Sequence, residues 1–302
     1  MFMEPSGVLI VNKPQGVTSH DIVNRIRRLY STKRVGHTGT LDPLATGVLV
    51  ILVGRAAKAA EYLSADTKEY IATLRLGLTT DTEDVTGTVL SQSEDIPCYD
   101  DVVSVVKSFE GEIFQIPPMY SALKVDGQKL CDLARKGVTV ERKARPITVF
   151  SIECTPTDVS TDYILKVKCS SGTYIRTLCA DIGSKLGCGG VMATLCRSDA
   201  GGFSIDEAVT LEELEALESN ERFALLKPIE NLFDDIPAIK LPAFYEKLSR
   251  NGCEIYQSKI RTSLPISSRV KLYGADGGFY ALGEVREYEK GSAIKTIKLF
   301  DI

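Results

Sequence analysis

The clearest alternation of hydrophobic and polar positions lies in residues 68–77, KEYIATLRLG. One face of this run is apolar: Tyr70, Ala72, Leu74 and Leu76. A period of two is typical of a strand with one buried face. The apolar run at 8–14 ends in a proline and predicts a strand that leads into a loop, and the run at 48–53 predicts a buried strand.

Helical spacing follows the first of these strands. Thr18 and Asp21 fit a capping box, and Ile22, Ile26 and Leu29 recur behind them at the spacing of one helix face. We expect this helix to display its arginines outward.

Helices and strands interleave along the rest of the first part of the chain. Helices are predicted over 55–65, 100–109, 178–187 and 210–219, and strands over 145–154 and 162–170. This mixture indicates an α+β domain that reaches to about residue 235. From there to residue 302, short strands separated by glycine turns predict a small β-rich C-terminal domain.

The length of 302 residues suits two domains, and a hydrophobic content of 44% can fill their cores. The longest apolar stretch, residues 47–54, is too short to cross a membrane, and no charged segment precedes the apolar run at the N-terminus. We therefore expect a cytoplasmic protein. Eight cysteines without a C-x-x-C pair and only two histidines argue against a metal site, so we expect reduced thiols.

Charge is unevenly distributed, although the net charge is only −4. Residues 22–35 carry five bases and no acid, and residues 124–145 carry seven bases against three acids. Residues 206–221 carry seven acids and no base. Each run alone fits a solvated face, but together they favour a polarised surface. The second basic run belongs to an insert at 115–146, and connections of this length are usually functional or mobile.

One carboxylate, Asp42, is isolated in the segment GHTGTLDPLATG at 36–47. An Asp-Pro pair is often no more than a turn. Pro43 pushes the backbone of Asp42 toward an extended conformation. A carboxylate held in such surroundings needs a cationic partner, because burying it unpaired is costly.

The segment SSGTYIRTLCADIG at 170–183 offers that partner. Residues 173–176 are predicted as a strand end with Thr177 as the N-cap of the next helix, which would place Tyr174 and Arg176 on the same side. Alternatively, Tyr174 is a core edge and Arg176 a surface residue. A carboxylate beside a guanidinium and a phenol fits nucleophilic or acid–base chemistry on an uncharged substrate.

Five segments occur in the order, and at about the spacings, of bacterial tRNA pseudouridine synthases: GHTGTLDPLATGVL, TKEYIATLRLGLTTDTEDVTG, IPPMYSALKVDGQKLCDLARKG, ARPITVF and SSGTYIRTL. The chain thus resembles the TruB family from residue 7 to about residue 205. This resemblance implies a pseudouridine-synthase-like mixed sheet with flanking helices at 1–235 and a PUA-like RNA-binding domain at 236–302. It also implies isomerisation of uridine 55 in the TΨC arm of tRNA, without a cofactor or metal.

The same resemblance implies a role for individual residues. Asp42 would be the catalytic nucleophile and Arg176 its salt-bridge partner. Tyr70 would stack on the flipped uracil, and Tyr174 would sit beside the sugar as a candidate proton acceptor. His37 would help to fill the place that the base leaves, or would be a satisfied loop histidine. Further residues match positions near the pocket or in an RNA-gripping loop: Lys13, Asp84, Leu195, Lys124, Lys129, Arg135 and Lys136.

The match to the family pattern is incomplete at one position. Cys196 stands where many relatives have the first of two consecutive arginines, which puts one RNA or core contact in doubt. Two other functions stay open: an RNA-binding or RNA-folding protein with an idle pocket, and a synthase directed by guide RNA. The intact site residues argue against the first and the insert against the second. We expect a monomer without an obligate protein partner, and leave open whether Asp42 attacks C6 of uracil or C1′ of ribose.

Overall fold

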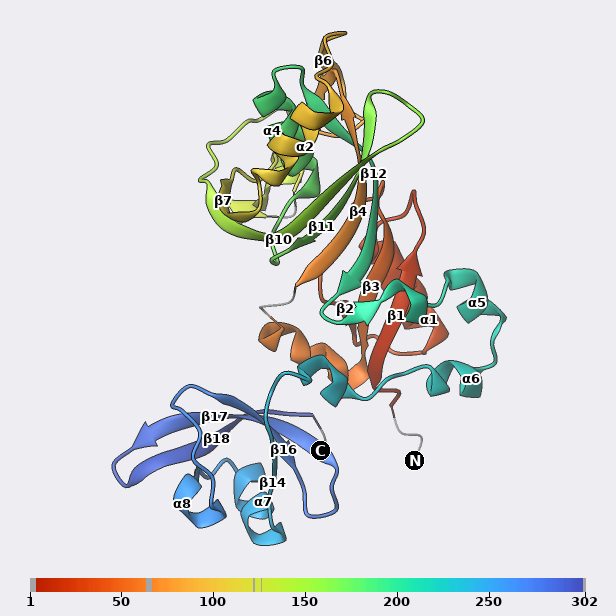
Figure 1. Cartoon of the computed structure of the whole chain (residues 1–302). Helices are drawn as coiled ribbons and strands as arrows, with labels where there is room; N and C mark the ends of the chain where they lie inside the picture. Colours follow the sequence, from red (N-terminus) through yellow and green to blue (C-terminus); the bar gives the residue numbers. More distant parts are fainter. Residues whose placement is uncertain (1–3, 64–66, 122, 126, 301–302) are drawn as a thin grey trace.

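Two large β-sheets form most of an elongated molecule, and the smaller of these two forms one end of it (Figure 1). The structure is a computed structural model and describes residues 4–63, 67–121, 123–125 and 127–300. The larger sheet has nine strands and the smaller sheet has five. All strands of the smaller sheet come from residues 238–299.

The larger sheet is mixed, with the order β1-β3-β12-β4-β11-β10-β7, β2 beside β3 and β13 beside β12. Its strands are β1 (Gly7–Lys13), β2 (Val35–His37), β3 (Thr46–Val53), β4 (Lys68–Leu76), β7 (Gly111–Gln115), β10 (Arg145–Pro156), β11 (Asp162–Cys169), β12 (Gly190–Ala200) and β13 (Phe203–Ser204). Neighbours pair antiparallel except β12 and β3, which pair parallel through Cys196 with Thr46 and Arg197 with Gly47. This short parallel contact joins the two halves of the sheet.

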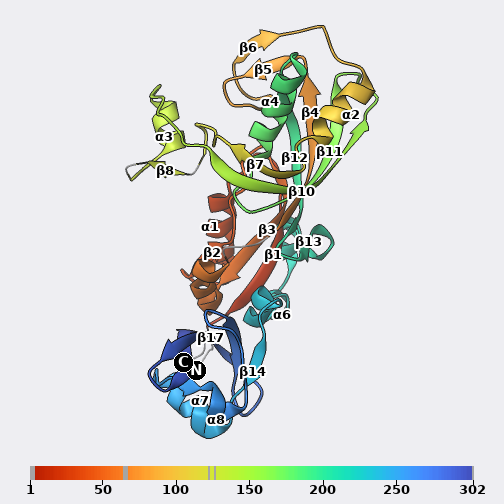
Figure 2. The ribbon, with the colours of Figure 1, turned by 60° about the vertical axis from the view of Figure 1, so that its left-hand side comes forward.

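Helices pack on both halves of the sheet (Figure 2). The helix α1 (Ser19–Leu29) lies beside β1–β3, whereas α2 (Tyr99–Lys107) and α4 (Ile175–Leu186) cover the half that contains β4. The apolar face predicted for β4 is buried in this core. Sheet and helices together confirm the predicted α+β class.

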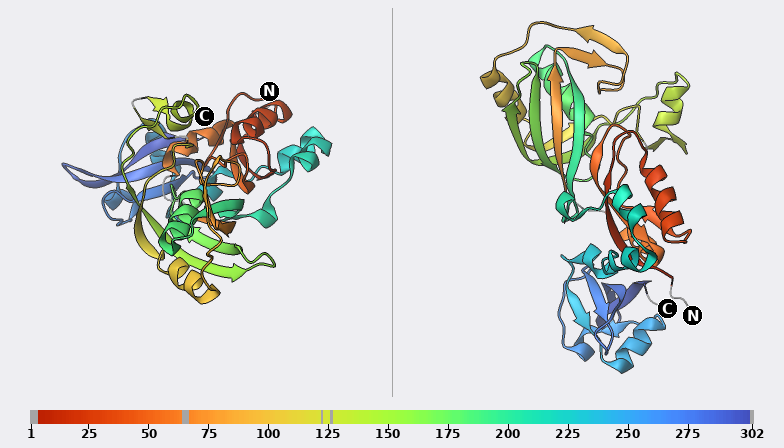
Figure 3. Two further views of the ribbon diagram at one scale, coloured as in Figure 1. Left: turned by 90° about the horizontal axis from the view of Figure 1, so that it is seen from above. Right: turned by 90° about the vertical axis from the view of Figure 1, so that its right-hand side faces the viewer.

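Between β7 and β10, the 115–146 insert leaves the sheet. It forms β8 (Lys124–Val125), β9 (Gln128–Lys129) and α3 (Leu130–Arg135). The insert projects on the same side of the molecule as α1 (Figures 2 and 3). A second short ribbon, β5 (Leu78–Thr80) with β6 (Val89–Gln92), follows β4.

The capping box predicted for α1 is present, with Thr18 and Asp21 bonded reciprocally. The acidic run lies next to this helix, in α5 (Leu211–Ala216) and α6 (Ser219–Ala224) (Figure 1). Arg25 points outward as expected, but its Nη1 lies 3.0 Å from Oε1 of Glu215. One base of the basic run is thus paired with one acid of the acidic run on this side.

The smaller sheet has the order β14-β16-β17-β18-β15 and its own apolar core. Its elements are β14 (Ala238–Lys240), α7 (Ala243–Arg250), β15 (Ile255–Tyr256), α8 (Gln257–Ile260), β16 (Arg269–Tyr273), β17 (Phe279–Tyr288) and β18 (Gly291–Leu299). The 3₁₀ helix η1 (Gly54–Tyr62) joins it to the larger sheet, because the Tyr62 hydroxyl donates to the carbonyl of Ile297 and Arg269 donates to the carbonyl of Tyr62.

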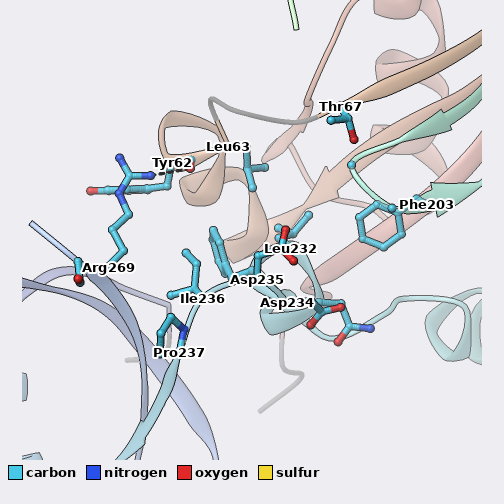
Figure 4. A pocket seen from close by; sticks show the side chains of 15 residues that line it. Tyr62, Leu63, Thr67, Phe203, Leu232, Asp234, Asp235, Ile236, Pro237 and Arg269 are labelled. Atoms are coloured by element: carbon cyan, nitrogen blue, oxygen red, sulfur yellow. Dashed lines mark hydrogen bonds between the residues drawn. The ribbon is translucent and has the colours of Figure 1, made fainter. Parts of the chain in front are cut away.

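A groove of about 710 Å³ lies between the two sheets (Figure 4). Its walls come from η1, from the turn after β12, and from the connection that contains the 3₁₀ helices η2 (Ile205–Glu207) and η3 (Ile229–Phe233). Figure 4 shows Arg269 beside the ring of Tyr62. Leu63 and Leu232 contribute apolar side chains to the wall of the groove. The smaller sheet is thus held by side-chain contacts as well as by the chain itself.

Two predicted helices differ from the observed elements. The 55–65 segment is the 3₁₀ helix η1 up to Tyr62, and its positions 64 and 65 lie outside the described residues. It follows β3 directly, without a side-chain cap. The 210–219 helix stops at Ala216, and α6 begins at Ser219. No helix in the described ranges is long and apolar enough to cross a membrane.

The fit between α4 and β12 gives a test of the packing. A Cβ added to Gly183 would lie 2.1 Å from the backbone nitrogen of Gly190. We expect Gly183→Ala to lower the free energy of unfolding by about 1–3 kcal/mol, because α4 must move away from β12. Urea unfolding measures this change. Ser184→Ala, at an exposed position of the same helix, is the control, and equal stability of the two variants would contradict the close packing.

Candidate active site

Asp42 lies on the loop between β2 and β3, and the backbone around it is fixed. The hydroxyl of Ser19 donates to the carbonyl of Leu41 at 3.0 Å and accepts from its amide at 2.8 Å. The amide of Gly16 donates to the carbonyl of Pro43. The Asp42 side chain keeps 39% of its surface exposed. Fixed backbone and an accessible carboxylate are what a reactive side chain requires.

Arg176 lies in the first turn of α4, and not at a strand end as predicted. The helix begins at Ile175 with Tyr174 as its N-cap, so the prediction of Thr177 as N-cap is wrong. The cause is the Gln115 side chain from β7, which accepts from the amide of Tyr174 at 2.8 Å and donates to its carbonyl at 3.0 Å. This amide clamp takes the place of a Ser or Thr cap.

The guanidinium of Arg176 is buried, with 5% of the side chain exposed, and is surrounded by acceptors. Its Nη2 lies 2.9 Å from Oδ2 of Asp42 and donates to the carbonyl of Tyr120 at 2.8 Å. Its Nη1 donates to the carbonyl of Thr82 at 3.1 Å and lies 3.8 Å from Oδ2 of Asp84. The predicted Asp42–Arg176 pair is therefore present, and the alternative of a surface arginine is wrong.

Asp84 is buried and tightly bonded. Its Oδ1 accepts from the amide of Thr86 at 2.9 Å and from the Thr82 hydroxyl at 2.8 Å. Its other oxygen faces Arg176. The predicted placement of Asp84 near the pocket is correct, and its contacts make it a second carboxylate on the same guanidinium.

A cavity of about 320 Å³ opens beside the ion pair. Its lining includes Asp42, Tyr70, Tyr174, Arg176 and Leu195. Tyr70 from β4 is 7% exposed, and burial raises the pKa of its phenol. Burial also raises the pKa of Tyr174. Both phenols are thus held in their neutral form at the wall of one cavity that also contains a carboxylate.

A second cavity, of about 740 Å³, shares Asp42 and Arg176 with the first. His37 and Asp84 also line it, together with Arg135 of the insert. Burial lowers the pKa of His37, and its Nδ1 has no hydrogen-bond partner in the described part of the chain. Asp42 therefore lies where the two cavities meet.

Lys13 is fully buried behind the Asp42 loop and does not line either cavity. Its ammonium donates to the carbonyls of Pro14 and Val17, each at 2.9 Å. Burial lowers its pKa to about 8, although the charge of Asp42 acts in the opposite direction. These contacts fit structural support of the turn between β1 and α1.

The basic side chains that are predicted to grip the RNA lie on the projecting insert. Arg135 is exposed and lies 3.4 Å from Oδ1 of Asp132, and Lys136 is exposed. The side chains of Lys124 and Lys129 lie outside the described residues. The insert thus places the basic side chain of Arg135 at the second cavity.

Arg197 is a residue of the site that the sequence analysis missed. It is 1% exposed, on the face of β12 that also bears Leu195. Its Nε donates to the carbonyl of Val48 at 2.7 Å and its Nη2 to the carbonyl of Gly39 at 3.0 Å. It thereby ties the loop that carries Asp42 to β12. A signal was available, because alternation along the strand places Arg197 on the buried face and Cys196 on the opposite, half-buried one.

Among the described residues, no group of three or more His, Cys, Asp or Glu side chains is placed to bind a metal ion. The chemical groups that line the two cavities include carboxylates, buried guanidinium groups and phenols.

Two family models match consecutive parts of the chain. Residues 27–175 match the N-terminal domain of TruB family pseudouridylate synthases, and residues 176–234 match the C-terminal domain of tRNA pseudouridylate synthase B. Solved structures are similar as well. Over 98% of this chain and 85% of the other, it is similar to a chain of a Cbf5-Nop10-Gar1 complex, with 26% identity and a TM-score of 0.75.

Curated relatives are similar over nearly their whole length. The tRNA pseudouridine synthase B of Alkaliphilus oremlandii is 43% identical over 97% of this chain and 98% of the relative. That of Francisella tularensis subsp. novicida is 41% identical over 98% of this chain and 95% of the relative. These similarities and the α+β fold confirm the resemblance found in the sequence, and the chain therefore belongs to the TruB family of tRNA pseudouridine synthases, isomerases that act on uridine in tRNA.

Proposed function

We propose that this protein isomerises uridine 55 in the TΨC arm of tRNA, with Asp42 as the nucleophile and without a cofactor. The observation that carries the proposal is the ion pair between Asp42 and the buried Arg176 at the junction of two cavities. Only Oδ2 of Asp42 makes this contact, and the side chain keeps solvent access. A carboxylate oriented by a fixed guanidinium is ready to attack an electrophilic carbon.

The reaction is an isomerisation and needs no oxidant or reductant. The carboxylate oxygen of Asp42 adds to C6 of uracil or to C1′ of ribose, and the bond between N1 and C1′ breaks. The base then turns, C5 bonds to C1′, and the adduct with Asp42 is released. The proton on C5 leaves for a base, and a proton is placed on N1, so that atoms and electrons balance. Tyr174, beside the sugar, is the candidate acceptor of the C5 proton, and because burial keeps its phenol neutral it takes up that proton only as it gives up its own hydroxyl proton.

A uridine inside a folded arm reaches Asp42 only if it leaves its stack. The cavity of about 320 Å³ is at the lower end of the size range of ligand pockets and suits one nucleoside. The Tyr70 ring and Leu195 offer the flipped uracil an aromatic and an apolar wall, and stacking offsets part of the cost of flipping. His37, in the second cavity, would occupy the place that the base leaves.

Two parts of the chain would hold the tRNA. The 115–146 insert and α1 project on the same side of the molecule, where the phosphates of the tRNA would meet exposed basic side chains (Figure 3). We assign residues 1–235 to the catalytic domain and 236–302 to a PUA-like RNA-binding domain, which the separate core of the smaller sheet supports. The Arg25–Glu215 pair reduces the share of α1 in phosphate binding.

Asp42→Asn removes the nucleophile and preserves the shape of the side chain. We expect no pseudouridine to form in an unmodified tRNA transcript, while tRNA affinity and unfolding stay as in the wild type. Mapping pseudouridine in the transcript measures the site and the yield together. Asp100→Asn, on the exposed surface of α2, is the control. Product above background from a folded Asp42→Asn protein would rule out Asp42 as the nucleophile.

Arg176→Lys keeps the positive charge but cannot contact Asp42, Thr82 and Tyr120 at once. We expect the single-turnover rate to fall by at least about tenfold, because an ammonium on a flexible stem cannot replace a planar fork. Arg75→Lys is the matched control, since Arg75 makes a two-pronged contact with Asp162 outside the cavities. If Arg176→Lys retained the wild-type rate, Arg176 would not be the partner that orients Asp42.

Neutralising Lys124, Lys129, Arg135 and Lys136 together tests the phosphate grip of the insert. Each phosphate contact that is lost should lower the slope of log affinity against log salt by about 0.7–0.9. We expect weaker tRNA binding with a shallower slope, and a smaller change in turnover at saturating tRNA. Binding over a salt series measures the slope. An unchanged slope would identify these bases as a solvated face.

A further inference from the structure

The loop at 80–87 lies between β5 and β6 and contains a residue in an unfavourable conformation. Glu83 has φ of +63°, in the left-handed region that side chains with a Cβ rarely occupy. Such backbone strain persists only where surrounding contacts hold it, and it is often found beside functional sites. Two groups of contacts around Glu83 show what the conformation achieves.

The backbone of the loop bridges β12 and Arg176. The carbonyl of Glu83 accepts from the amide of Met192 at 3.0 Å, and the amide of Val85 donates to the carbonyl of Met192 at 3.1 Å. The preceding carbonyl, of Thr82, accepts from Arg176. The turn at Glu83 thus lets the carbonyls of two consecutive residues serve two different partners, one on the sheet and one in the site.

The side chain of Glu83 reaches the same helix turn as Arg176. Its Oε2 accepts from the hydroxyl of Thr177 at 2.5 Å, and Thr177 is 4% exposed. Burial raises the pKa of Glu83, and the nearby acid Asp84 acts in the same direction, whereas Thr177, Arg176 and Arg142 oppose it. Asp181, one turn further along α4, has its pKa raised to about 6 by burial and by Glu83. The bond to Thr177 is therefore a buried contact between the loop and α4.

We propose that Glu83 is a positioning residue for Arg176. Its carboxylate fixes the 80–87 loop to the first turn of α4, and this sets the guanidinium against Asp42. The alternative is that Glu83 only completes a turn, in which case glycine would serve as well or better, because glycine adopts positive φ without strain. The proposal rests on the proposed roles of Asp42 and Arg176.

The test is a double-mutant cycle with Glu83→Gly and Thr177→Val, measured as single-turnover pseudouridine formation at saturating tRNA. If the two residues act through their mutual bond, each variant is slower by about tenfold, and the double variant is no slower than either. The tRNA dissociation constant should stay within about twofold of the wild-type value, since neither side chain lines the 320 Å³ cavity. Thr177→Ser keeps the hydroxyl and should recover most of the rate.

Val85→Ala is the control in the same loop, because the Val85 side chain is 36% exposed and only its backbone bonds to β12. A wild-type rate for Glu83→Gly, or single effects that multiply in the double variant, would overturn the proposal. If Glu83→Gly does not fold, the comparison of Thr177→Val with Thr177→Ser tests the proposal instead. Equal single-turnover rates of these two variants would also overturn the proposal. Asp42→Asn in the same assay distinguishes failure of this proposal from failure of the proposed function. Product from that variant would refute the role of Asp42 as the nucleophile and not only the role of Glu83.

Discussion

A buried guanidinium without acceptors would be too costly to fold around, and the larger sheet is arranged so that Arg176 has them. Its partners come from three segments, namely the loop after β2, the loop after β5 and the insert, whereas Arg176 itself belongs to α4. Each segment is anchored separately, by Ser19, Met192 and Gln115 among others. The arrangement of the site thus follows from the need to give the buried guanidinium of Arg176 its hydrogen-bond acceptors.

The buried guanidinium of Arg197 has a different set of acceptors. Two of its hydrogen bonds go to main-chain carbonyls and another joins it to the Tyr70 phenol, and none of the ion pairs within the described ranges involves it. Its charge contributes to the lowered pKa values of Lys13 and His37. One arginine therefore orients a carboxylate, while the other holds backbone and raises the positive potential behind the Asp42 loop. The Asp42 carboxylate is thus held by Arg176 and still keeps 39% of its surface exposed.

Local patterns predicted those parts of the fold that depend on short stretches of chain. The capping box at Thr18 and the alternation from Tyr70 to Leu76 describe α1 and β4 correctly, because each rests on neighbours within a few residues. The start of α4 was not predictable in this way, because the clamp on Tyr174 comes from Gln115, far away in the sequence. The buried position of Arg197 follows from the alternation along its strand, but its role could not be predicted locally, since its acceptors lie on the loop before β3 and on β3 itself. The pairing of Arg25 with Glu215 likewise joins distant runs, so charge counts along the sequence could not predict which acid would face this base.

The parallel contact between β12 and β3 also bears on how the site comes into being during folding. The hydroxyl of Thr46 donates to the carbonyl of Leu195 across 149 positions, and Asp42 and Arg176 are also far apart in the sequence, so both pairs meet only after most of the domain has been synthesised. Non-local pairings of this kind form slowly, because the long intervening chain must first be ordered. A nascent chain would carry Asp42 on an early hairpin with no guanidinium beside it. The ion pair between Asp42 and Arg176 can therefore form only when the domain closes, so that its formation would mark a late stage of folding.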